Sequence, residues 1–339
     1  MCDSKPIRPR ALLRADAGRS IGFGHYVRTC AMAAYMADDY DCTIFSRNPE
    51  GGDLSPFQRS LLGKAGFMAY PDRDAGDLGK YNLWFLDQIR ADDLVVLDNY
   101  FHTTEYMNQV KRRCRALVCI DDMHDRHFPA DAVLTFCPLE ERDFDLAPYT
   151  RFRGGIEWSF LRLPFLKPLT TTPRDSERIV MAMGGADPLG LTEKMLGILS
   201  EIAPSKQIDV IAGDTVKVSP RPGVRIHRGA DASEIAGIFD QSSLGIFPAS
   251  TICVEALSRR LPIAAGYFVD NQEEIYADGV KRGWFMPLGS FRDSSAEIAQ
   301  RIEPALRNIR EGAHTAPQID FQKTRTELLT LLGECMKNS

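Results

Sequence analysis

The sequence has no long hydrophobic run and no closely spaced cysteine pair, and neither sign of charge dominates it. No apolar stretch approaches the roughly 20 residues that a membrane-spanning helix needs. The opening residues, Met1 to Pro6, contain no apolar segment of the kind that marks a secretory signal. We therefore expect a cytoplasmic protein that has no membrane partner.

The cysteines also argue against a metal centre or a disulfide framework. None of the eight belongs to a C-x-x-C pair, and most lie in apolar stretches, as Cys119 does between Val118 and Ile120. This pattern is typical of buried free thiols in a reducing compartment.

The charge balance excludes another class of partner. The formal net charge is −5, from 41 Lys and Arg residues against 46 Asp and Glu residues. Such a chain repels nucleic acid on average, so we expect no nucleic-acid partner. We also expect a small-molecule ligand and a monomer. The length of 339 residues predicts two domains of about 150–170 residues, each with its own core.

Short apolar strands alternate with helical patterns along both halves of the chain, which is typical of parallel sheets covered on both faces. Strands are expected at 11–14, 42–45, 94–97, 116–120, 178–183, 207–211, 224–226, 244–247 and 262–265. Helices are expected from residue 25 and at 54–65, 103–113, 191–199, 233–239, 252–259 and 273–281. The pattern predicts an α/β protein with two doubly wound, Rossmann-like domains that face a cleft.

A stretch rich in proline and threonine gives the expected domain boundary. We assign residues 1–167 to an N-terminal domain, 168–176 to a linker and 177–339 to a C-terminal domain. The tail from Ser294 onward reads as helical and polar, and it is a candidate for packing across the domain junction.

The first motif with chemical content follows the first expected strand and Asp16. Gly22 and Gly24 allow a ligand to approach the backbone closely and place His25 at a helix start, one turn before Arg28. A helix N-terminus disfavours imidazolium, so His25 is expected to be neutral and able to take a proton from water. Two interpretations remain open here: a catalytic loop, or a glycine turn followed by a histidine.

Two further motifs follow expected strands of the second half. Gly184 and Gly185, just before Asp187, expose backbone N–H groups that suit a pyrophosphate, although a plain glycine turn explains them equally well. After the strand at 244–247, Ser250 and Thr251 can cap a helix or hold phosphate oxygens.

Side chains suited to ribose and sugar hydroxyls lie close to these motifs in the sequence. Glu255 follows Thr251 by one helical turn, where a carboxylate can accept ribose hydroxyls. Asn271 and Gln272 precede the next expected helix and carry amides that suit sugar hydroxyls. A helix with an exposed glutamate and an ordinary N-cap are the alternative interpretations.

Other polar residues end neighbouring strands of the first half and are candidates for the same site as His25: Asp98, Asn99, Tyr100, Asp121 and Asp122. His124 and His127 beside these aspartates invite a metal hypothesis. A solvated turn explains that cluster better, and we expect no metal.

Taken together in order, these motifs resemble the UDP-2,4-diacetamido-2,4,6-trideoxy-β-L-altropyranose hydrolases of pseudaminic acid biosynthesis. The resemblance runs over roughly residues 11–285. It is carried by the segments RAD at 14–16, IGFGH at 21–25 with Arg28, VLDNY at 96–100, IDD at 120–122, MGGAD at 183–187, AST at 249–251 with Glu255, and NQE at 271–273.

The resemblance implies a glycosyltransferase-B fold and hydrolysis of a UDP-sugar without metal or other cofactor, with inversion at the anomeric carbon. It implies that His25 is the general base. The C-terminal domain would hold the nucleotide through Gly184, Gly185, Asp187, Ser250, Thr251 and Glu255. The sugar would be contacted by Asp16, Gly22, Gly24, Arg28, Asn99, Tyr100, Asp121, Asn271 and Gln272.

The sequence departs from this family at several positions, which affects the identity of the sugar more than the class of reaction. Gly18 stands where the family has serine, Asn99 where histidine is common, and Val254 where asparagine occurs. Two alternatives stay open: a glycosyltransferase of the same fold that uses a UDP-sugar donor, and a nucleotide-sugar binding protein without turnover.

Overall fold

The computed structural model describes residues 8–18, 23–47, 54–70, 77–169, 171–185 and 187–337. Gly22, Ala186 and residues 48–53 lie outside these ranges. The chain divides into two compact units: residues 1–162 with 321–339 form the first, and residues 163–320 form the second.

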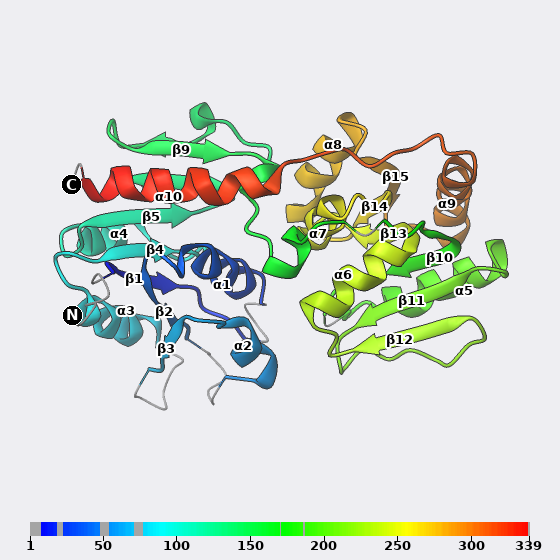
Figure 1. The fold of residues 1–339 in the computed structure, drawn as a ribbon, viewed down its shortest axis with the longest axis horizontal. Coiled ribbons are helices and arrows are strands. Elements are labelled where there is room, and N and C mark those ends of the chain that lie inside the picture. Colours follow the sequence, from blue (N-terminus) through cyan, green and yellow to red (C-terminus); the bar gives the residue numbers. More distant parts are fainter. Residues whose placement is uncertain are drawn as a thin grey trace, which may run out of the picture. The chain divides into compact units, whose positions relative to one another are not determined.

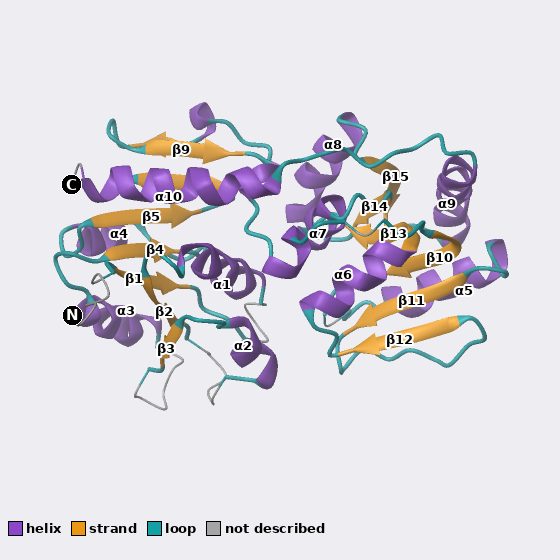
Figure 2. Ribbon diagram, in the orientation of Figure 1, coloured by secondary structure: helices purple, strands orange, loops and turns teal. Residues whose placement is uncertain are grey.

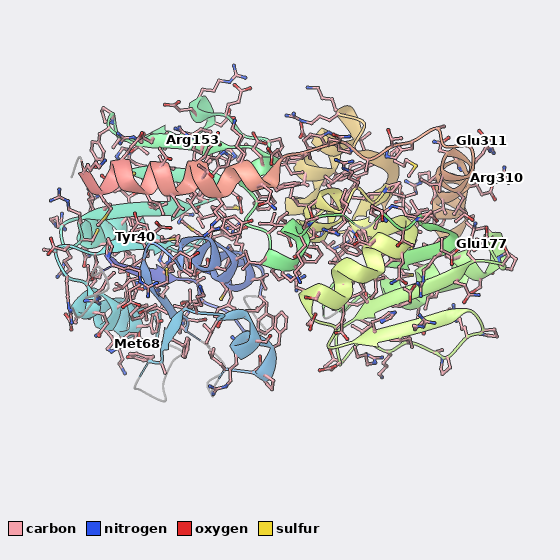
Figure 3. All side chains as sticks on the ribbon, viewed as in Figure 1. Tyr40, Met68, Arg153, Glu177, Arg310 and Glu311 are labelled. Atoms are coloured by element: carbon pink, nitrogen blue, oxygen red, sulfur yellow. The ribbon has the colours of Figure 1, made fainter. Side chains whose placement is uncertain are left out.

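Within the described residues, the first unit contains a seven-stranded parallel sheet. In sheet order its strands are β3 (Gly66–Met68), β2 (Asp41–Phe45), β1 (Arg10–Arg14), β4 (Leu94–Leu97), β5 (Ala116–Ile120), β7 (Ala132–Thr135) and β9 (Arg151–Gly154). Its helices are α1 (Gly24–Met36), α2 (Pro56–Leu61), α3 (Leu78–Gln88), α4 (Thr104–Lys111) and α10 (Phe321–Lys337). Met68 and Arg153, labelled in Figure 3, mark its two edge strands.

The second unit is built on a six-stranded parallel sheet, counted over the same ranges. Its strands, in sheet order, are β12 (Val224–Arg228), β11 (Gln207–Ala212), β10 (Asp175–Met181), β13 (Ser242–Pro248), β14 (Ile263–Tyr267) and β15 (Phe285–Ser290). Its helices are α5 (Leu191–Ile202), α6 (Ala232–Gln241), α7 (Thr251–Ser258), α8 (Glu273–Lys281) and α9 (Ser295–Arg310). Figure 2 shows helices lying along the strands in each unit.

The remaining elements are short. A two-stranded ladder joins β6 (His127–Phe128) to β8 (Asp145–Leu146), and 3-10 turns form η1 (Glu141–Asp143), η2 (Ile156–Trp158), η3 (Leu163–Leu166) and η4 (Asp270–Gln272). No helix in the described ranges is long and apolar enough to cross a lipid bilayer.

The same strand order explains the apolar patterns of both halves. In each sheet the first strand is central, the next two extend to one side, and the later strands extend to the other. Every residue of β4, β5 and β13 is buried, because helices cover both faces of a doubly wound sheet. The predicted fold class of two doubly wound units is therefore confirmed.

The strand order reverses at one place in each sheet, between β1 and β4 in the first unit and between β10 and β13 in the second. Ligands of open α/β sheets bind beyond the carboxyl ends of the strands at such a switch point. The residues that follow these four strands are therefore the candidates for a ligand-binding site.

The structure corrects several element predictions. The helix expected at 54–65 covers only Pro56–Leu61, since Gly63 takes a left-handed φ of +56° and the chain then enters strand β3. The helix α3 and the strands β3, β6, β7, β8, β9 and β15 were not predicted. β9 is an edge strand that contains two arginines and no fully buried residue, so its sequence has no apolar run that would predict a strand.

The domain boundaries also differ from the prediction. The C-terminal helix α10, red in Figure 1, lies alongside β5 and β9 and belongs to the first unit. Arg325 Nε donates to the Tyr35 carbonyl at 3.1 Å, and Arg115 Nε donates to the Met336 carbonyl at 2.9 Å. Leu328 and Leu332 are fully buried, so this helix completes the core of the first unit.

The segment predicted as a linker at 168–176 is fixed to the second unit. Arg259, only 2% exposed, pairs with Asp240 and donates to the carbonyls of Lys167 and Pro168. Arg174 donates to the Ser242 carbonyl at 2.9 Å. The division between the units therefore falls earlier, after residue 162.

Candidate active site

The switch point of the first sheet brings Asp16 and Asn99 together. Arg14 and Leu97 are partners in the β1–β4 register, so the residues that follow them are neighbours. The Asp16 backbone N–H donates to Asn99 Oδ1 at 2.7 Å, and Asn99 Nδ2 donates to the Asp16 carbonyl at 3.4 Å. An amide at position 99 thus joins the two strand ends.

His25 lies at the beginning of α1 and is held on two sides. Its Nδ1 is 2.7 Å from Asp98 Oδ1, and its ring meets the Tyr100 ring edge-on at a centroid distance of 4.5 Å. The histidine side chain is 11% exposed, whereas Asp98 is fully buried. The imidazole is therefore fixed in place but retains access to solvent.

Asp98 is the centre of this cluster. Arg28 donates to both of its carboxylate oxygens, Nε to Oδ2 at 2.7 Å and Nη2 to Oδ1 at 2.6 Å, and Thr29 Oγ1 donates to Oδ2 at 2.9 Å. Burial alone would raise the pKa of Asp98, but the charge of Arg28 and the bonds from Arg28 and His25 lower it below its usual range. The carboxylate is therefore ionised at neutral pH.

An ionised Asp98 determines the tautomer of His25. A carboxylate can only accept, so Nδ1 carries the proton of the 2.7 Å bond, and the Arg28 Nη2 atom 3.2 Å from Nδ1 is a neighbour and not a donor to it. In the neutral ring the lone pair then lies on Nε2, which has no hydrogen-bond partner in the described part of the chain. Nε2 is the nitrogen able to accept a proton.

A second carboxylate completes the network. Arg28 Nη1 donates to Asp122 Oδ2 at 2.6 Å, Tyr100 donates to the same oxygen at 3.3 Å, and Thr135 donates to Oδ1 at 3.1 Å. Burial lowers the pKa of Arg28, but the charges of Asp122 and Asp98 outweigh it and raise that pKa well above its usual value. Arg28 therefore remains a cation that bridges β4 and β5.

Asp16 and Asp121, both predicted to contact the sugar, are engaged with the protein itself. Asp16 is fully buried and accepts from the backbone N–H and Nε of Arg47, both at 3.0 Å. Asp121 is 3% exposed and accepts from the backbone N–H groups of Met123 and His124. Both carboxylates shape the loops around the site, and their contact with a sugar stays a prediction.

The switch point of the second sheet presents backbone instead of charged side chains. Gly184 has a left-handed φ of +100°, and no described atom lies within 4 Å of a Cβ placed on Gly184 or Gly185. A Cβ on Gly213, which follows β11, would lie 1.9 Å from the Gly185 carbonyl oxygen. The Gly184–Gly185 turn is therefore open on one side and packed against glycine on the other.

The two helices that begin near this turn differ at their N-termini. Asp187 accepts from the backbone N–H groups of Leu191 and Thr192, both at 2.8 Å, so it caps α5. Ser250 makes no side-chain bond to α7 and donates instead to the Pro248 carbonyl at 3.3 Å. The N-terminus of α7, where Thr251 is exposed, is thus the better anion site of the two.

The remaining predicted residues of the second unit occupy mixed positions. Glu255 is 8% exposed on α7, one turn after Thr251. Gln272 Oε1 accepts from the Phe268 backbone N–H at 3.0 Å, which closes the loop before α8. The side chain of Asn271 lies outside the described structure, as does the whole of Gly22.

The two histidines considered for a metal site, His124 and His127, contact different residues. His127 Nδ1 lies 2.9 Å from Asp145 Oδ1 on the short β6–β8 ladder, and the His124 ring lies against Phe144. Among the described residues, no three His, Cys, Asp or Glu side chains are grouped to hold a metal ion.

Sequence reasoning missed the roles of Asp98 and Asp122. Both were noted as strand ends, yet Asp121, and not its neighbour Asp122, was predicted as a ligand. The side chains of adjacent residues leave a strand on opposite sides, and the sequence does not show which side faces α1. The signal that could have found them is Arg28, since a buried guanidinium requires carboxylates.

These two sheets define the glycosyltransferase-B fold, and this chain is similar to solved structures of proteins with that fold. One is a UDP-glucosyltransferase from Polygonum tinctorium, with a TM-score of 0.61 and 12% identity over 98% of each chain. Another is S. aureus MnaA solved with UDP, with a TM-score of 0.63 and 9% identity over 98% of this chain and 97% of that one. At these identities the likeness shows the fold alone.

A curated relative agrees with the resemblance found in the motifs. The chain is 22% identical over 290 residues to the UDP-2,4-diacetamido-2,4,6-trideoxy-beta-L-altropyranose hydrolase of Campylobacter jejuni, covering 81% of this chain and 97% of the relative. No family model matches the chain.

Proposed function

We propose that this protein hydrolyses a UDP-activated diacetamido-trideoxyhexose, with water attacking the anomeric carbon, inversion at that carbon and release of UDP. The observation that carries the proposal is the 2.7 Å contact between His25 Nδ1 and Asp98 Oδ1 at the switch point of the first sheet. The similarity to the Campylobacter jejuni hydrolase supports the choice of substrate.

His25 acts as the general base in this mechanism. As the oxygen of water bonds to the anomeric carbon, Nε2 takes a proton from that water, and the bond from the anomeric carbon to the diphosphate oxygen breaks. The electron pair of that bond leaves with UDP. Asp98 holds the ring in the required tautomer and stabilises the imidazolium that forms, while Arg28 keeps Asp98 ionised.

The first unit supplies the sugar contacts. Two of the residues assigned to the sugar follow strand β4. The ring of Tyr100 lies against His25, and Asn99 bonds to the backbone of Asp16. Gly22, Gly24, Arg28, Asp16 and Asp121 are assigned to the sugar side by the motif resemblance. Asn271 and Gln272 are assigned to the sugar or the phosphates from the second unit.

The nucleotide is assigned to the second unit. The uncapped N-terminus of α7 and the open Gly184–Gly185 turn offer N–H groups that offset the charge developing on the leaving diphosphate, so the reaction as proposed needs no metal ion. Ser250 and Thr251 lie beside the phosphates, and Glu255 accepts the ribose hydroxyls. Asp187 contributes by shaping the turn, since its oxygens are occupied at α5.

The test is turnover of UDP-linked diacetamido-trideoxyhexoses by the His25→Ala and His25→Asn variants, with UDP release followed by chromatography. We expect the rate to fall by about 10²–10⁴-fold in both variants. The matched control is His127→Ala, because that histidine is 41% exposed and pairs with a carboxylate outside the site. A correctly folded His25 variant with a near-wild-type rate would remove the base from the mechanism.

A glycosyltransferase of the same fold is the second candidate, because an acceptor hydroxyl can give its proton to Nε2 of His25 in the same way as water. Incubation of the protein with a UDP-sugar alone separates the two. A hydrolase releases UDP stoichiometrically, a transferase releases little without an acceptor hydroxyl, and a non-catalytic binding protein retains the intact UDP-sugar.

A further inference from the structure

Two exposed aromatic rings stand at the beginning of α1. Phe23, the residue before this helix, is 38% exposed, and Phe57 of α2 is 45% exposed. Their ring centroids are 6.0 Å apart and their planes are at 88°, an edge-to-face contact. No other ring pair in the described residues has both rings exposed. An exposed edge-to-face pair of this kind offers an apolar surface to a ligand.

The exposure of Phe57 is built into the fold. Ser55 and Gln58 form a capping box at the start of α2, with Pro56 in its first position. The buried Tyr26 donates from its hydroxyl to the Gln58 carbonyl at 3.1 Å, which ties α2 to α1. Gln58 itself is 4% exposed. The helix α2 is therefore fixed to α1, and the ring of its residue Phe57 is exposed to solvent.

One ring of the pair is also close in sequence to the proposed base. Phe23 is two residues before His25, and its carbonyl accepts the first backbone hydrogen bond of the helix, from Val27 at 2.9 Å. The His25 ring is fixed by Asp98 and Tyr100. Phe23 therefore belongs to the turn that leads into His25, and we assign the ring substituents of a sugar bound at Nε2 to this turn.

We propose that Phe23 and Phe57 form an apolar platform that binds a methyl group of the sugar and selects for it, an inference that rests on the proposed function. The methyl is that of a 6-deoxy carbon or of an acetamido group. Aromatic carbon attracts a methyl group, whereas a hydroxyl in its place loses water and gains no hydrogen bond. The two rings thus determine which sugar is accepted and take no part in proton transfer.

Three donors distinguish the two sources of the methyl group: UDP-N-acetylglucosamine, its 6-deoxy analogue and UDP-glucose. The ratio of kcat/KM for the first two reports on a C6 methyl, and the ratio for the first and third reports on an acetamido methyl. We expect Phe57→Ala to reduce one of these ratios by about 10–100-fold. Phe57→Leu, which stays apolar, should retain most of it.

The matched control is Leu83→Ala on α3, a 65% exposed apolar side chain that should leave both ratios unchanged. The pH profile of kcat should be unaltered in Phe57→Ala, because the base is intact. The platform is contradicted if Phe57→Ala changes neither ratio, or if it lowers kcat/KM equally for all three donors.

The outcome can be separated from that of the proposed function. If the wild type releases UDP and Phe57→Ala leaves the ratios unchanged, hydrolysis stands and the platform fails. If the wild type releases none, Kd values for the same donors by calorimetry decide it. A preference for the methyl that is lost in Phe57→Ala then supports the platform without hydrolysis, and equal Kd ratios contradict it.

Discussion

The two sheets of this protein reverse their strand order in the same way, but the residues at the two switch points differ in kind. At the first, Arg28 joins Asp98 and Asp122 in a closed network of ion pairs that positions His25. At the second, the strand ends carry glycine, serine and threonine, and helix α7 begins without a side-chain cap.

In the reaction that we propose, this difference would assign the base to one sheet and the diphosphate to the other. Positioning a base requires side chains whose charges are satisfied within the protein, because a rigid carboxylate fixes both tautomer and direction. Binding a diphosphate requires N–H groups that the protein leaves available. The predictions below test each half of this contrast.

The largest effect is expected from Asp98→Asn in the first unit. An amide cannot hold His25 in the Nδ1–H tautomer and leaves Arg28 with one carboxylate, so kcat should fall by about 10³–10⁴-fold, as in other His–Asp pairs. UDP release by chromatography measures the rate, and calorimetric Kd for UDP checks the second unit. A matching loss of UDP affinity would show that the two halves are not separate in function.

The same carboxylate predicts an acid limit to the stability of the first unit. Its pKa is lowered in the folded state, so its stabilising contribution is present above the unfolded value of about 3.9 and is lost as pH falls toward the folded value. Thermal unfolding of wild type and Asp98→Asn between pH 7 and pH 2 should show a Tm difference of several °C, of the order expected for one such group, that shrinks below about pH 4. A constant difference across that range contradicts the assignment.

Gly213→Ala tests the second unit. The added Cβ would lie 1.9 Å from the Gly185 carbonyl oxygen, so we expect a loss of about 1–3 kcal/mol and weaker UDP binding as the glycine turn shifts. Gly197→Ala in α5 is the control, because no described atom lies within 4 Å of its added Cβ and alanine favours a helix. Chemical denaturation and UDP titration measure both, and equal behaviour of the two variants would contradict the account.

The smallest effect is expected from Asp187→Ala. This residue caps α5, so its loss should cost about 0.5–2 kcal/mol of stability while UDP affinity changes little. Denaturant unfolding gives the first quantity and calorimetry the second. A large loss of UDP affinity with unchanged stability would place Asp187 in direct contact with the nucleotide.

The sequence predicted the elements that have strong periodic patterns and the residues that end buried strands. The strands 94–97 and 116–120 and the helix 273–281 have the expected bounds, since each is a clear apolar run or amphipathic turn. The strand β9 was not predicted because an edge strand needs no apolar face. The return of α10 to the first unit was not predicted because it depends on long-range packing that local patterns do not show.

The sequence predicted which residues follow the strands at the candidate site, but not where their side chains point. The His25 ring lies against Tyr100, whereas Asn99 bonds to the backbone of Asp16. The sequence could not show that Asp16 is occupied by Arg47, or that Asp122 and not Asp121 faces Arg28, because these outcomes depend on side-chain direction at the end of each strand.

The most direct test of the mechanism is hydrolysis in water enriched in ¹⁸O, followed by NMR and mass spectrometry of the first products. If His25 delivers water to the anomeric carbon, the label appears in the free sugar, the first anomer released is inverted, and UDP is unlabelled. Label in a phosphate product would mean attack on phosphorus and would contradict the account.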